Sequence, residues 1–556
     1  MALKMETQQA KNWLKRAMRP YRVAIALLAC LAVFSSFSTL AFAYITRFLI
    51  DDAASGNERG LMLYVGILLG LLCLRITLQA LGRFFSDKTR AKIVRDLRNQ
   101  VYENILRSDY AQIQGYHSGE LLNRITTDLQ EIATTQVWLL PSLAAMLTQC
   151  VGAILALLTT DVIFTVIYIA CGVVFSGIAV LFRRQIKKRQ KDVLEMDGRS
   201  RAYMQEGLSS LVTIKAYNAE EKSATENSLL TEKHYRAKLK RSALNSCMHA
   251  VFAFLSNFGL IFAIVWCGFS IFKGNTNYGV MLSVVLLLMQ FQHPLSAFTT
   301  ILPARYTQLT SGERISQLYE LKKDDSATSC INVIPYTDIS SIGVENVSFQ
   351  YGEDKVFSNA NMDIEKGDVV CITGASGSGK STLFKLFLGI FQPNDGKIYL
   401  TTENGRVEVT AAHRELFAYV PQGNFLFSGA VYDNLTFFAD ESDKNDTCVR
   451  EAIQIACAEF VYDLPQGLQT VLLEKGEGLS EGQLQRLAIA RAIVSNRPIL
   501  LFDEATSALD EQTESQIIDN IAKLENKTCV IVSHRPSALR IANKRFIVEN
   551  GAIIKE

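Results

Sequence analysis

The fold of the second half of this chain is decided by the stretch Val369-Val370-Cys371-Ile372-Thr373-Gly374-Ala375-Ser376-Gly377-Ser378-Gly379-Lys380-Ser381-Thr382. Its first five residues predict a buried strand, and the amphipathic run Leu383–Phe391 that follows predicts a helix. Between them lies a glycine-rich loop whose backbone N–H groups can point into one concavity and bind phosphate oxygens. The N-terminus of the helix adds partial positive charge at the same place. The stretch therefore predicts an α/β domain that binds a nucleotide.

The side chains of this loop predict how the phosphates are held. We expect Lys380 to reach the β- and γ-phosphates and Ser381 to ligate Mg²⁺. The expected nucleotide-binding residues of the loop are Gly374, Ser376, Gly377, Ser378, Gly379, Lys380, Ser381 and Thr382.

A second apolar run, Ile499–Phe502, predicts another buried strand, and it ends in the carboxylates Asp503 and Glu504. Asp503 is suited to hold Mg²⁺, directly or through water, and Glu504 to polarise an attacking water molecule. An acidic pair at a strand end can also be purely structural. The glycine-rich phosphate-binding loop (P-loop) in the same domain favours the catalytic interpretation.

The first three hundred residues contain six apolar stretches that are long enough to cross a bilayer, which takes about 20 residues of helix. They lie near Val23–Ile50, Leu61–Gly82, Val137–Leu158, Val162–Phe182, Ala250–Ile271 and Gly279–Leu302. A cleaved signal peptide is the alternative for the first stretch, but that stretch is longer than the roughly 7–15 apolar residues of such a signal.

Polar links of unequal length set the expected orientation of these spans. Two long connections, Arg83–Gln136 and Arg183–His249, are rich in Arg and Lys, as is the N-terminus. Because basic residues favour the cytoplasmic side, we expect these segments to face the cytoplasm and the short links to face outward. Helical breaks predict turns near Gln112–Ser118 and Gly207–Lys215.

A few polar residues lie inside the expected spans. Arg75 is in the inner half of the second span, with Gln79 one turn further on the same face, and a charge at a span centre costs about 2.5–3.5 kcal/mol. Arg75 therefore either extends to the inner surface or faces a water-filled substrate cavity. Gln290 and His293 share a face of the last span and are weaker cavity candidates; the adjacent Pro294 predicts a kink.

Composition limits the possible functions. The chain has 556 residues, enough for at least two domains. Its formal charge of +2 gives no reason to expect nucleic acid as a partner. The 11 cysteines are scattered singly, without metal-ligand spacing, and are expected to be reduced thiols.

The order of these motifs resembles the ATP-binding cassette (ABC) family. Between the P-loop and the acidic pair lies Leu479-Ser480-Glu481-Gly482-Gln483, which resembles the signature turn that completes the ATP site of a partner copy in that family. The six-span layout, with Gly119-Glu120-Leu121-Leu122-Asn123-Arg124 and Ile214-Lys215-Ala216-Tyr217-Asn218-Ala219-Glu220-Glu221, resembles the membrane domain of ABC exporters. In those proteins the two inner turns are coupling helices that press on the ATPase domains.

The resemblance implies further roles, residue by residue. Tyr351 matches the aromatic residue that stacks on adenine, and Gln422 matches the glutamine that links the Mg²⁺ and water site to the coupling helices. Asp510 matches a residue that communicates across the dimer, and His534 matches the γ-phosphate switch. Ser480, Gly482 and Gln483 match the turn that binds the partner's ATP, and Glu474 lies where exporters contact the second coupling helix. Glu481 departs from the family, which usually has glycine there.

The sequence therefore predicts a half-size exporter. We expect an all-α six-helix transmembrane domain with long cytoplasmic extensions at 1–320, a linker at 321–340 and an α/β P-loop ATPase domain at 341–556. The expected activity is ATP hydrolysis with Mg²⁺ coupled to movement of a lipid, drug or hydrophobic peptide across the plasma (inner) membrane, with the N-terminus and the ATPase domain in the cytoplasm. The expected partner is a second copy of the chain; a related half-transporter, or an ATP-gated channel or regulator on the same fold, remains an alternative.

Overall fold

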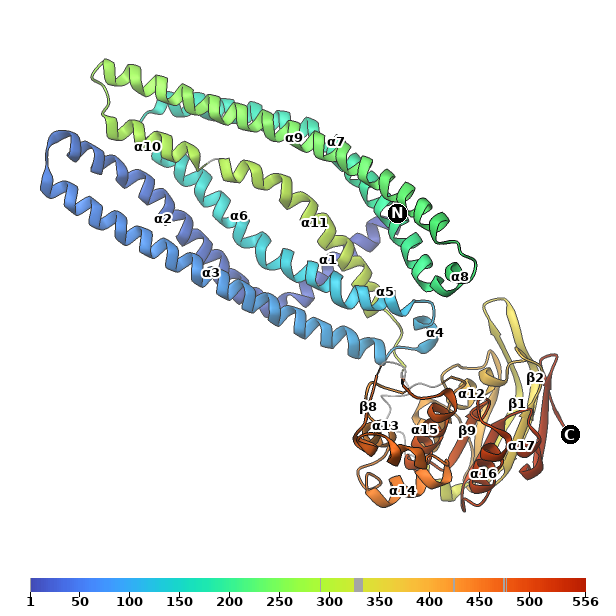
Figure 1. Ribbon diagram of the computed structural model, residues 1–556. Helices are drawn as coiled ribbons and strands as arrows, with labels where there is room; N and C mark the ends of the chain where they lie inside the picture. Colours follow the sequence, from blue (N-terminus) through green and yellow to red (C-terminus); the bar gives the residue numbers. More distant parts are fainter. Residues whose placement is uncertain (1, 291, 325–333, 424–425, 474–475, 477) are drawn as a thin grey trace. The chain divides into compact units, whose positions relative to one another are not determined.

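The computed structural model describes residues 2–290, 292–324, 334–423, 426–473, 476 and 478–556, whose elements are labelled in Figure 1. Two compact units make up the chain. The first comprises Met1–Tyr102 and Ser118–Tyr319, and the second comprises Glu103–His117 and Glu320–Glu556. The segment Glu103–His117, which is flanked in sequence by the two parts of the first unit, thus clusters with the second unit. The middle of the expected linker, residues 325–333, lies outside the described residues.

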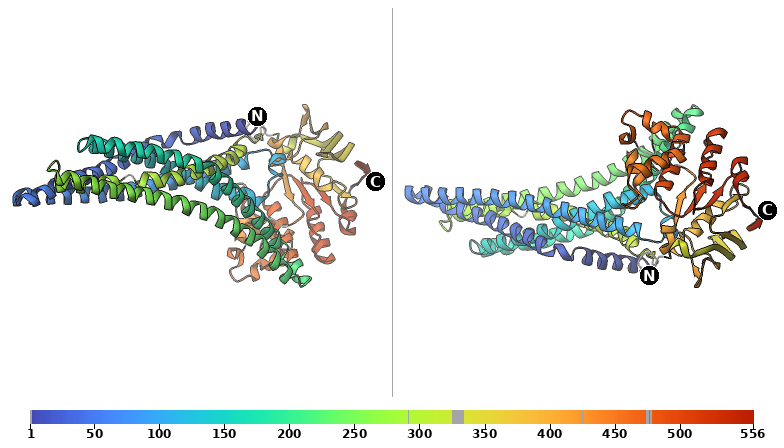
Figure 2. Two further views of the ribbon diagram at one scale, coloured as in Figure 1. Left: turned by 90° about the horizontal axis from the view of Figure 1, so that it is seen from above. Right: turned by 90° about the horizontal axis from the view of Figure 1, so that it is seen from below.

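The first unit consists of helices, most of them long, and Figures 1 and 2 show the long ones running alongside one another. They are α1 (Ala2–Ala17), α2 (Arg22–Ser55), α3 (Glu58–Leu106, its last turn in the second unit), α5 (Ser118–Asn123), the π-helix η2 (Arg124–Asp128), α6 (Leu129–Leu158), α7 (Val162–Ser209), α8 (Leu211–Ala216), α9 (Glu220–Phe272), α10 (Tyr278–Met289) and α11 (Gln292–Tyr319). In the described part of the chain, four helical segments are long and apolar enough to cross a membrane: Arg19–Ser55, Glu58–Leu106, Ser118–Leu158 and Glu220–Phe272. The chain is a membrane protein of the helical type.

The first five expected spans each fall within one helix, which confirms their helical assignment. The first of them is part of the 34-residue α2, which is far longer than the apolar segment of a signal peptide. The last expected span, Gly279–Leu302, falls on α10, which ends at Met289, and α11, which begins at Gln292; residue 291 lies outside the described residues. Pro294 is the third residue of α11, and it has no N–H to bond the carbonyl of the residue four positions earlier, Gln290, which caps the end of α10. A proline is tolerated in a first turn, where its missing N–H has no intrahelical partner in any case.

Side-chain contacts fix the ends of the helices opposite the long connections. Asp161 caps α7 by accepting a hydrogen bond from the backbone N–H of Phe164 at 3.0 Å, and it also accepts the indole N–H of Trp266 at 2.8 Å. Asp51, at the end of α2, accepts the backbone N–H of Gly279 at the start of α10 at 3.1 Å. These contacts hold α2 against α10 and α7 against α9.

The second unit contains two main sheets. The larger is a six-stranded sheet in the order β12-β11-β3-β10-β9-β6, parallel except for β12. The smaller is an antiparallel sheet in the order β2-β1-β4-β5, and β7 pairs with β8. The strands are β1 (Ile339–Tyr351), β2 (Asp354–Glu365), β3 (Val369–Thr373), β4 (Asp395–Thr402), β5 (Gly405–Glu408), β6 (Phe417–Val420), β7 (Gly429–Ala430), β8 (Val471–Leu472), β9 (Ile499–Asp503), β10 (Thr528–Val532), β11 (Lys544–Glu549) and β12 (Ala552–Lys555).

Helices cover the six-stranded sheet, and the burial of its strands shows why. On β3, Val370 and Ile372 belong to the core shared with the smaller sheet, whereas Cys371 belongs to the core shared with the helices. A parallel strand that is buried on both faces has a continuous apolar sequence, as β3 and β9 have. The helices of the unit are α4 (Tyr110–Ile113), α12 (Lys380–Phe387), α13 (Val431–Thr436), α14 (Asp446–Ile455), α15 (Glu481–Val494), α16 (Glu511–Ala522) and α17 (Pro536–Ile541).

The expected strand Val369–Thr373 is confirmed, and so is a strand at Ile499–Phe502. The predicted helix Leu383–Phe391 starts earlier and ends earlier than expected, at Lys380 and Phe387. The early end has a local cause, since Gly389 has a φ of +58°, a left-handed conformation that terminates helices. In the larger sheet β10 lies between β3 and β9, so the carboxyl ends of all three strands meet at one edge. Ligands of open α/β sheets bind at this edge.

Candidate functional site

The P-loop follows β3 and leads into α12. A Cβ atom added at Gly374 would lie 2.4 Å from the carbonyl oxygen of Val548, and one added at Gly379 would lie 2.5 Å from Cγ1 of Val356. Both glycines also have positive φ angles, +145° and +105°. Only glycine therefore fits these two positions, and the backbone of the loop can curl back on itself.

Polar groups inside the loop fit a phosphate ligand. The buried Lys380 donates from Nζ to the carbonyl oxygens of Gly374 at 2.6 Å and Ala375 at 2.9 Å, so its ammonium lies over the loop. The hydroxyl oxygen of Ser378 is buried and has no hydrogen-bond partner among the described residues. Buried polar atoms are normally paired, and a phosphate oxygen would pair this one.

Asp503, at the end of β9, is 2% exposed and lies beside the loop. It interacts with the hydroxyl of Ser381 and accepts a hydrogen bond from the phenol of Tyr419 at 3.2 Å. Burial raises the pKa of the Asp503 carboxyl above its ordinary value, and these two hydrogen bonds oppose the rise. A carboxylate and a hydroxyl beside a phosphate loop are the hard oxygen ligands that suit Mg²⁺.

Glu504 directly follows Asp503 and has an unusual backbone. Its φ is +50°, and its N–H donates to the carbonyl oxygen of Val532 at 3.1 Å. A non-glycine residue in this region is strained, and such strain is common where a side chain must be aimed. The carboxylate accepts a hydrogen bond from Nε2 of Gln422 at 2.9 Å. The structure thus brings together two of the residues predicted to be catalytic.

The signature turn begins α15. Ser480 caps the helix with its hydroxyl, which accepts the N–H of Gln483 at 3.2 Å, while Oε1 of Gln483 accepts the N–H of Ser480 at 2.8 Å. A Cβ at Gly482 would lie 3.0 Å from the carbonyl oxygen of Ala508. One turn further along α15, Gln485 bonds Ser507 and the N–H of Ala508. These contacts join the turn to the segment that follows Glu504.

The remaining predicted residues occupy separate places in the second unit. Tyr351 is half-buried, with its hydroxyl 3.3 Å from that of Thr382. Asp510 caps α16 by accepting the N–H of Thr513 at 3.1 Å. His534 is exposed just beyond β10, and Glu474 lies outside the described residues.

Sequence reasoning missed the neighbours of Tyr351. The ring of Tyr351 lies edge-on to Phe391, with centroids 5.4 Å apart, and Phe391 in turn lies edge-on to Tyr110 of α4 at 5.8 Å. Tyr110 therefore connects the first expected coupling turn to the aromatic cluster of the predicted adenine site. Nothing in the local sequence around Tyr110 or Phe391 indicates this pairing.

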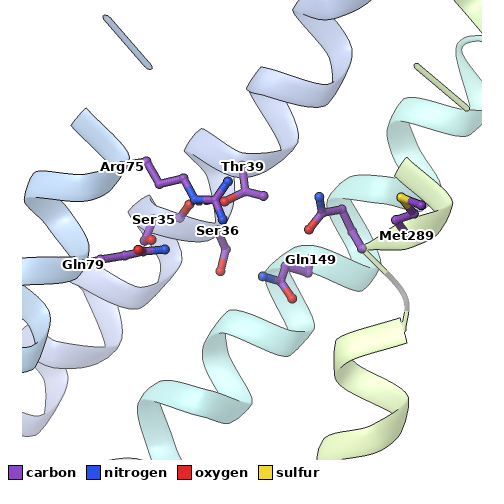
Figure 3. A pocket seen from close by; sticks show the side chains of 8 residues that line it. Ser35, Ser36, Thr39, Arg75, Gln79, Gln149 and Met289 are labelled. Atoms are coloured by element: carbon purple, nitrogen blue, oxygen red, sulfur yellow. Dashed lines mark hydrogen bonds between the residues drawn. The ribbon is translucent and has the colours of Figure 1, made fainter. Parts of the chain in front are cut away.

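A polar pocket of about 300 Å³ lies within the helices of the first unit. It is lined by Ser35, Ser36, Thr39, Arg75, Gln79, Gln149, Met289 and Gln290, and Figure 3 shows Arg75 directed from α3 toward Thr39 on α2. The structure thus brings together two of the three predicted cavity residues, Arg75 and Gln290. The side chain of the third, His293, lies outside the described part of the chain.

Comparisons with known proteins agree with this architecture. The family described as "ABC transporter transmembrane region" matches residues 25–295, and the family described as "ABC transporter" matches residues 357–507. The chain belongs to the ABC transporter family. With the membrane domain and the ATPase domain on one chain, the protein is an ATP-driven transporter that binds nucleotide.

Its relatives are named as transporters, lipid flippases and drug exporters. The transporter is 27% identical to a "Probable ABC transporter ATP-binding/permease protein" of Haemophilus influenzae, over 88% of this chain and 89% of that protein. It is 24% identical to an "ATP-dependent lipid A-core flippase" of Idiomarina loihiensis (97% and 92% covered) and 25% identical to the "Putative multidrug export ATP-binding/permease protein YgaD" of Bacillus subtilis (97% and 94% covered).

A solved structure shares the fold of the transporter. It is described as a bacterial Atm1-family ABC exporter with ATP bound, and the two superimpose with a TM-score of 0.77 at 22% identity, over 96% of this chain and 94% of that one. This agreement confirms the predicted fold class, a helical membrane domain followed by an α/β ATPase domain.

Proposed function

We propose that the transporter is an exporter that works as a homodimer and moves an amphipathic substrate out of the cytoplasm. The observation that carries this proposal is the polar pocket inside the membrane helices, on the same chain as the predicted ATPase residues. Polar and ionisable side chains within spans are costly, and they generally line a substrate path. The names of the relatives, a lipid flippase and a drug exporter, support an amphipathic substrate.

The residues of the second unit suggest how the chain handles ATP. Ser378, Lys380 and the loop N–H groups would hold the phosphates, and Ser381, Asp503 and Gln422 would hold Mg²⁺. When bound, Mg²⁺ neutralises charge on the phosphate oxygens. Glu504, oriented by Gln422, would accept the proton of the attacking water, and His534 would contact the γ-phosphate. Because Gln422 bonds Glu504, a movement of the Gln422 segment would change the position of the catalytic carboxylate.

The homodimer proposal is supported by the place of the signature turn. Ser480 and Gly482 are joined by α15 to the segment after Glu504, and in this family the turn faces the phosphates bound by the opposite copy. We infer that Ser480 and Gln483 of one copy complete the site that Lys380 of the other begins.

Exposed apolar surfaces support the same arrangement. In the first unit Val212 of α8 is 83% exposed and the adjacent Tyr217 is 80% exposed. In the second unit Phe427, Phe437 and Phe438 form a ring cluster that is also exposed. We infer that these exposed apolar surfaces are covered when two copies assemble, since water-exposed aromatic clusters of this kind mark interaction sites.

Complementation between two variants tests the dimer. Lys380→Ala and Ser480→Ala should each be inactive as homodimers. A heterodimer purified through two different tags retains one intact site, built from the wild-type P-loop of one copy and the wild-type turn of the other. Recovered ATP hydrolysis in the heterodimer supports sites shared between copies, and an inactive heterodimer would contradict them.

Transport itself is tested in inside-out vesicles. Wild-type protein should accumulate a fluorescent amphiphile against its gradient when MgATP is added, and Glu504→Gln protein should not. Equilibration that stops when the concentrations are equal would instead indicate a channel. Because the sites should be on the cytoplasmic face of the plasma (inner) membrane, ATP added to right-side-out vesicles should have no effect.

A further inference from the structure

We propose that the polar pocket of the membrane helices receives the head of an anionic amphiphile, a phosphate or carboxylate group attached to an apolar tail. This inference names the substrate class and rests on the proposed function of the pocket as part of the transport path. Its basis is the charge of the lining. Arg75 is the single charged residue among the eight described lining residues, and none of them is acidic.

The guanidinium of Arg75 has no hydrogen-bond or ion-pair partner among the described residues, although the side chain is half-buried between α2 and α3. A half-buried guanidinium carries five N–H donors, and leaving them unpaired within a span is unfavourable. Water or a ligand must therefore satisfy them. The planar fork of the guanidinium matches the two oxygens of a carboxylate or phosphate.

Uncharged polar groups surround this cation. Gln79 lies one turn along α3 from Arg75, Gln149 comes from α6, and Gln290 directly follows the last residue of α10. Among the described residues these three amide side chains also lack hydrogen-bond partners, and Figure 3 shows Gln149 across the pocket from Arg75. Amides and hydroxyls can pair with either a donor or an acceptor, so they do not determine the sign of the ligand's charge. Arg75 does decide it, because a cationic head would lie within a few ångströms of a like charge in a poorly solvated site.

The size of the pocket limits what it holds. A volume of about 300 Å³ is at the lower end of the range for whole small-molecule sites. It therefore accommodates a head group rather than a complete lipid or drug. Apolar side chains such as Leu72, Leu74 and Ile76 are exposed on α3 next to Arg75. They would face the bilayer, where a tail attached to the head could remain.

Direct binding tests the proposal without requiring transport. Glu504→Gln protein in phosphatidylcholine nanodiscs, without nucleotide, is titrated with dodecyl phosphate, dodecyl glucoside and dodecyltrimethylammonium by calorimetry. Titrations into protein-free nanodiscs are subtracted, because all three probes partition into lipid. The wild-type pocket should bind the phosphate at least about 10-fold more tightly than the cation, the scale of a hydrogen bond to a charged group. Equal affinity for the three heads would overturn the proposal.

Variants of Arg75 test whether the preference for an anionic head group arises in the pocket. Arg75→Gln should weaken dodecyl phosphate by about 10-fold or more, Arg75→Lys should retain part of the preference, and Arg75→Glu should shift it to the cation. Arg83→Gln is the matched control, since Arg83 is on the same helix, is exposed and does not line the pocket. An equal loss in both glutamine variants would overturn the assignment to the pocket.

Two further measurements distinguish a soluble anion from an amphiphile, and a failure of the proposed function from a failure of this inference. Inorganic phosphate should not compete with dodecyl phosphate, and competition at equal concentration would show that the site takes a soluble anion rather than an amphiphile. If wild-type vesicles fail to accumulate substrate but the binding preference is present, the proposed function fails and this inference stands. If transport occurs but binding ignores charge, only this inference fails.

Discussion

Arg535 forms an ion pair of 2.5 Å with Glu514, whose side chain is 1% exposed. The same guanidinium donates to the carbonyl oxygen of Ser507 at 2.7 Å and that of Leu509 at 2.8 Å. Glu514 is also hydrogen-bonded by Thr506 and Ser537. The segment after His534 is thereby fixed to the segment after Glu504, so the loops carrying two predicted catalytic residues move together.

Replacing Arg535 with alanine should destabilise the ATPase domain. Removing one partner of a fully buried pair costs about 3–5 kcal/mol, and the partial exposure of Arg535 reduces this to about 2–3 kcal/mol. The thermal unfolding temperature of the nucleotide-free protein should fall by about 5–10 °C, since 1 kcal/mol corresponds to about 2–4 °C for a domain of this size. Arg540→Ala is the control, because Arg540 of α17 pairs with Asp519 of α16 on the exposed surface. Equal shifts for the two variants would contradict this account.

Glu504→Gln should abolish hydrolysis but keep ATP binding. The amide can still accept the hydrogen bond from Gln422, so the geometry is retained while the general base is lost, at a cost of about 10²–10⁴ in rate. Gln422→Ala should have a smaller effect on hydrolysis and a larger one on its stimulation by substrate, because the base remains and its orienting contact is removed. Steady-state ATPase assays with and without substrate separate the two outcomes. A Glu504→Gln protein that hydrolyses ATP at the wild-type rate would exclude Glu504 as the base.

Asp503→Asn should stabilise the nucleotide-free protein and abolish its response to Mg²⁺. Burial raises the pKa of this carboxyl, so its ionised form destabilises the folded state, and stability is lost as pH rises from the ordinary pKa through the raised one. The variant should therefore unfold at a higher temperature than wild type at neutral pH, and the difference should shrink as the pH is lowered. Chelating Mg²⁺ should reduce the stabilisation of wild type by ATP and leave the variant unchanged. A variant less stable than wild type at neutral pH would contradict the sign of this effect.

Glu481→Gly should leave the ATPase rate and apparent ATP affinity within about 2-fold of wild type, because the side chain is exposed at the first position of α15, where an acidic residue interacts favourably with the helix N-terminus. Ser480→Ala should reduce hydrolysis strongly, since it removes both the cap and the hydroxyl expected to face the partner's phosphate. Titrating ATP against both variants compares them directly. A large gain in affinity for Glu481→Gly would show that the carboxylate repels the nucleotide.

Local chemistry explains which parts of the fold the sequence predicted. The strand at Val369–Thr373 and the glycines after it are recognisable because phosphate binding needs a backbone conformation that only glycine adopts at Gly374 and Gly379. The expected spans are recognisable because a bilayer requires long apolar helices. The end of α10 at Met289 agrees with the interruption that Pro294 predicts, because a proline leaves the carbonyl four residues earlier without its helical partner.

The sequence by itself determined the two-part organisation of this transporter and the chemistry expected of its nucleotide site, because those features depend on contiguous residues and short-range backbone geometry. Only the tertiary structure decided which distant side chains meet. The pocket combines residues of α2, α3, α6 and α10. Likewise Arg535, which caps the start of α17, pairs with Glu514 of α16. Such contacts depend on helix packing and strand order, so no spacing along the chain encodes them. For that reason Arg75 had two interpretations in the sequence, whereas in the fold it lines a pocket with three glutamines.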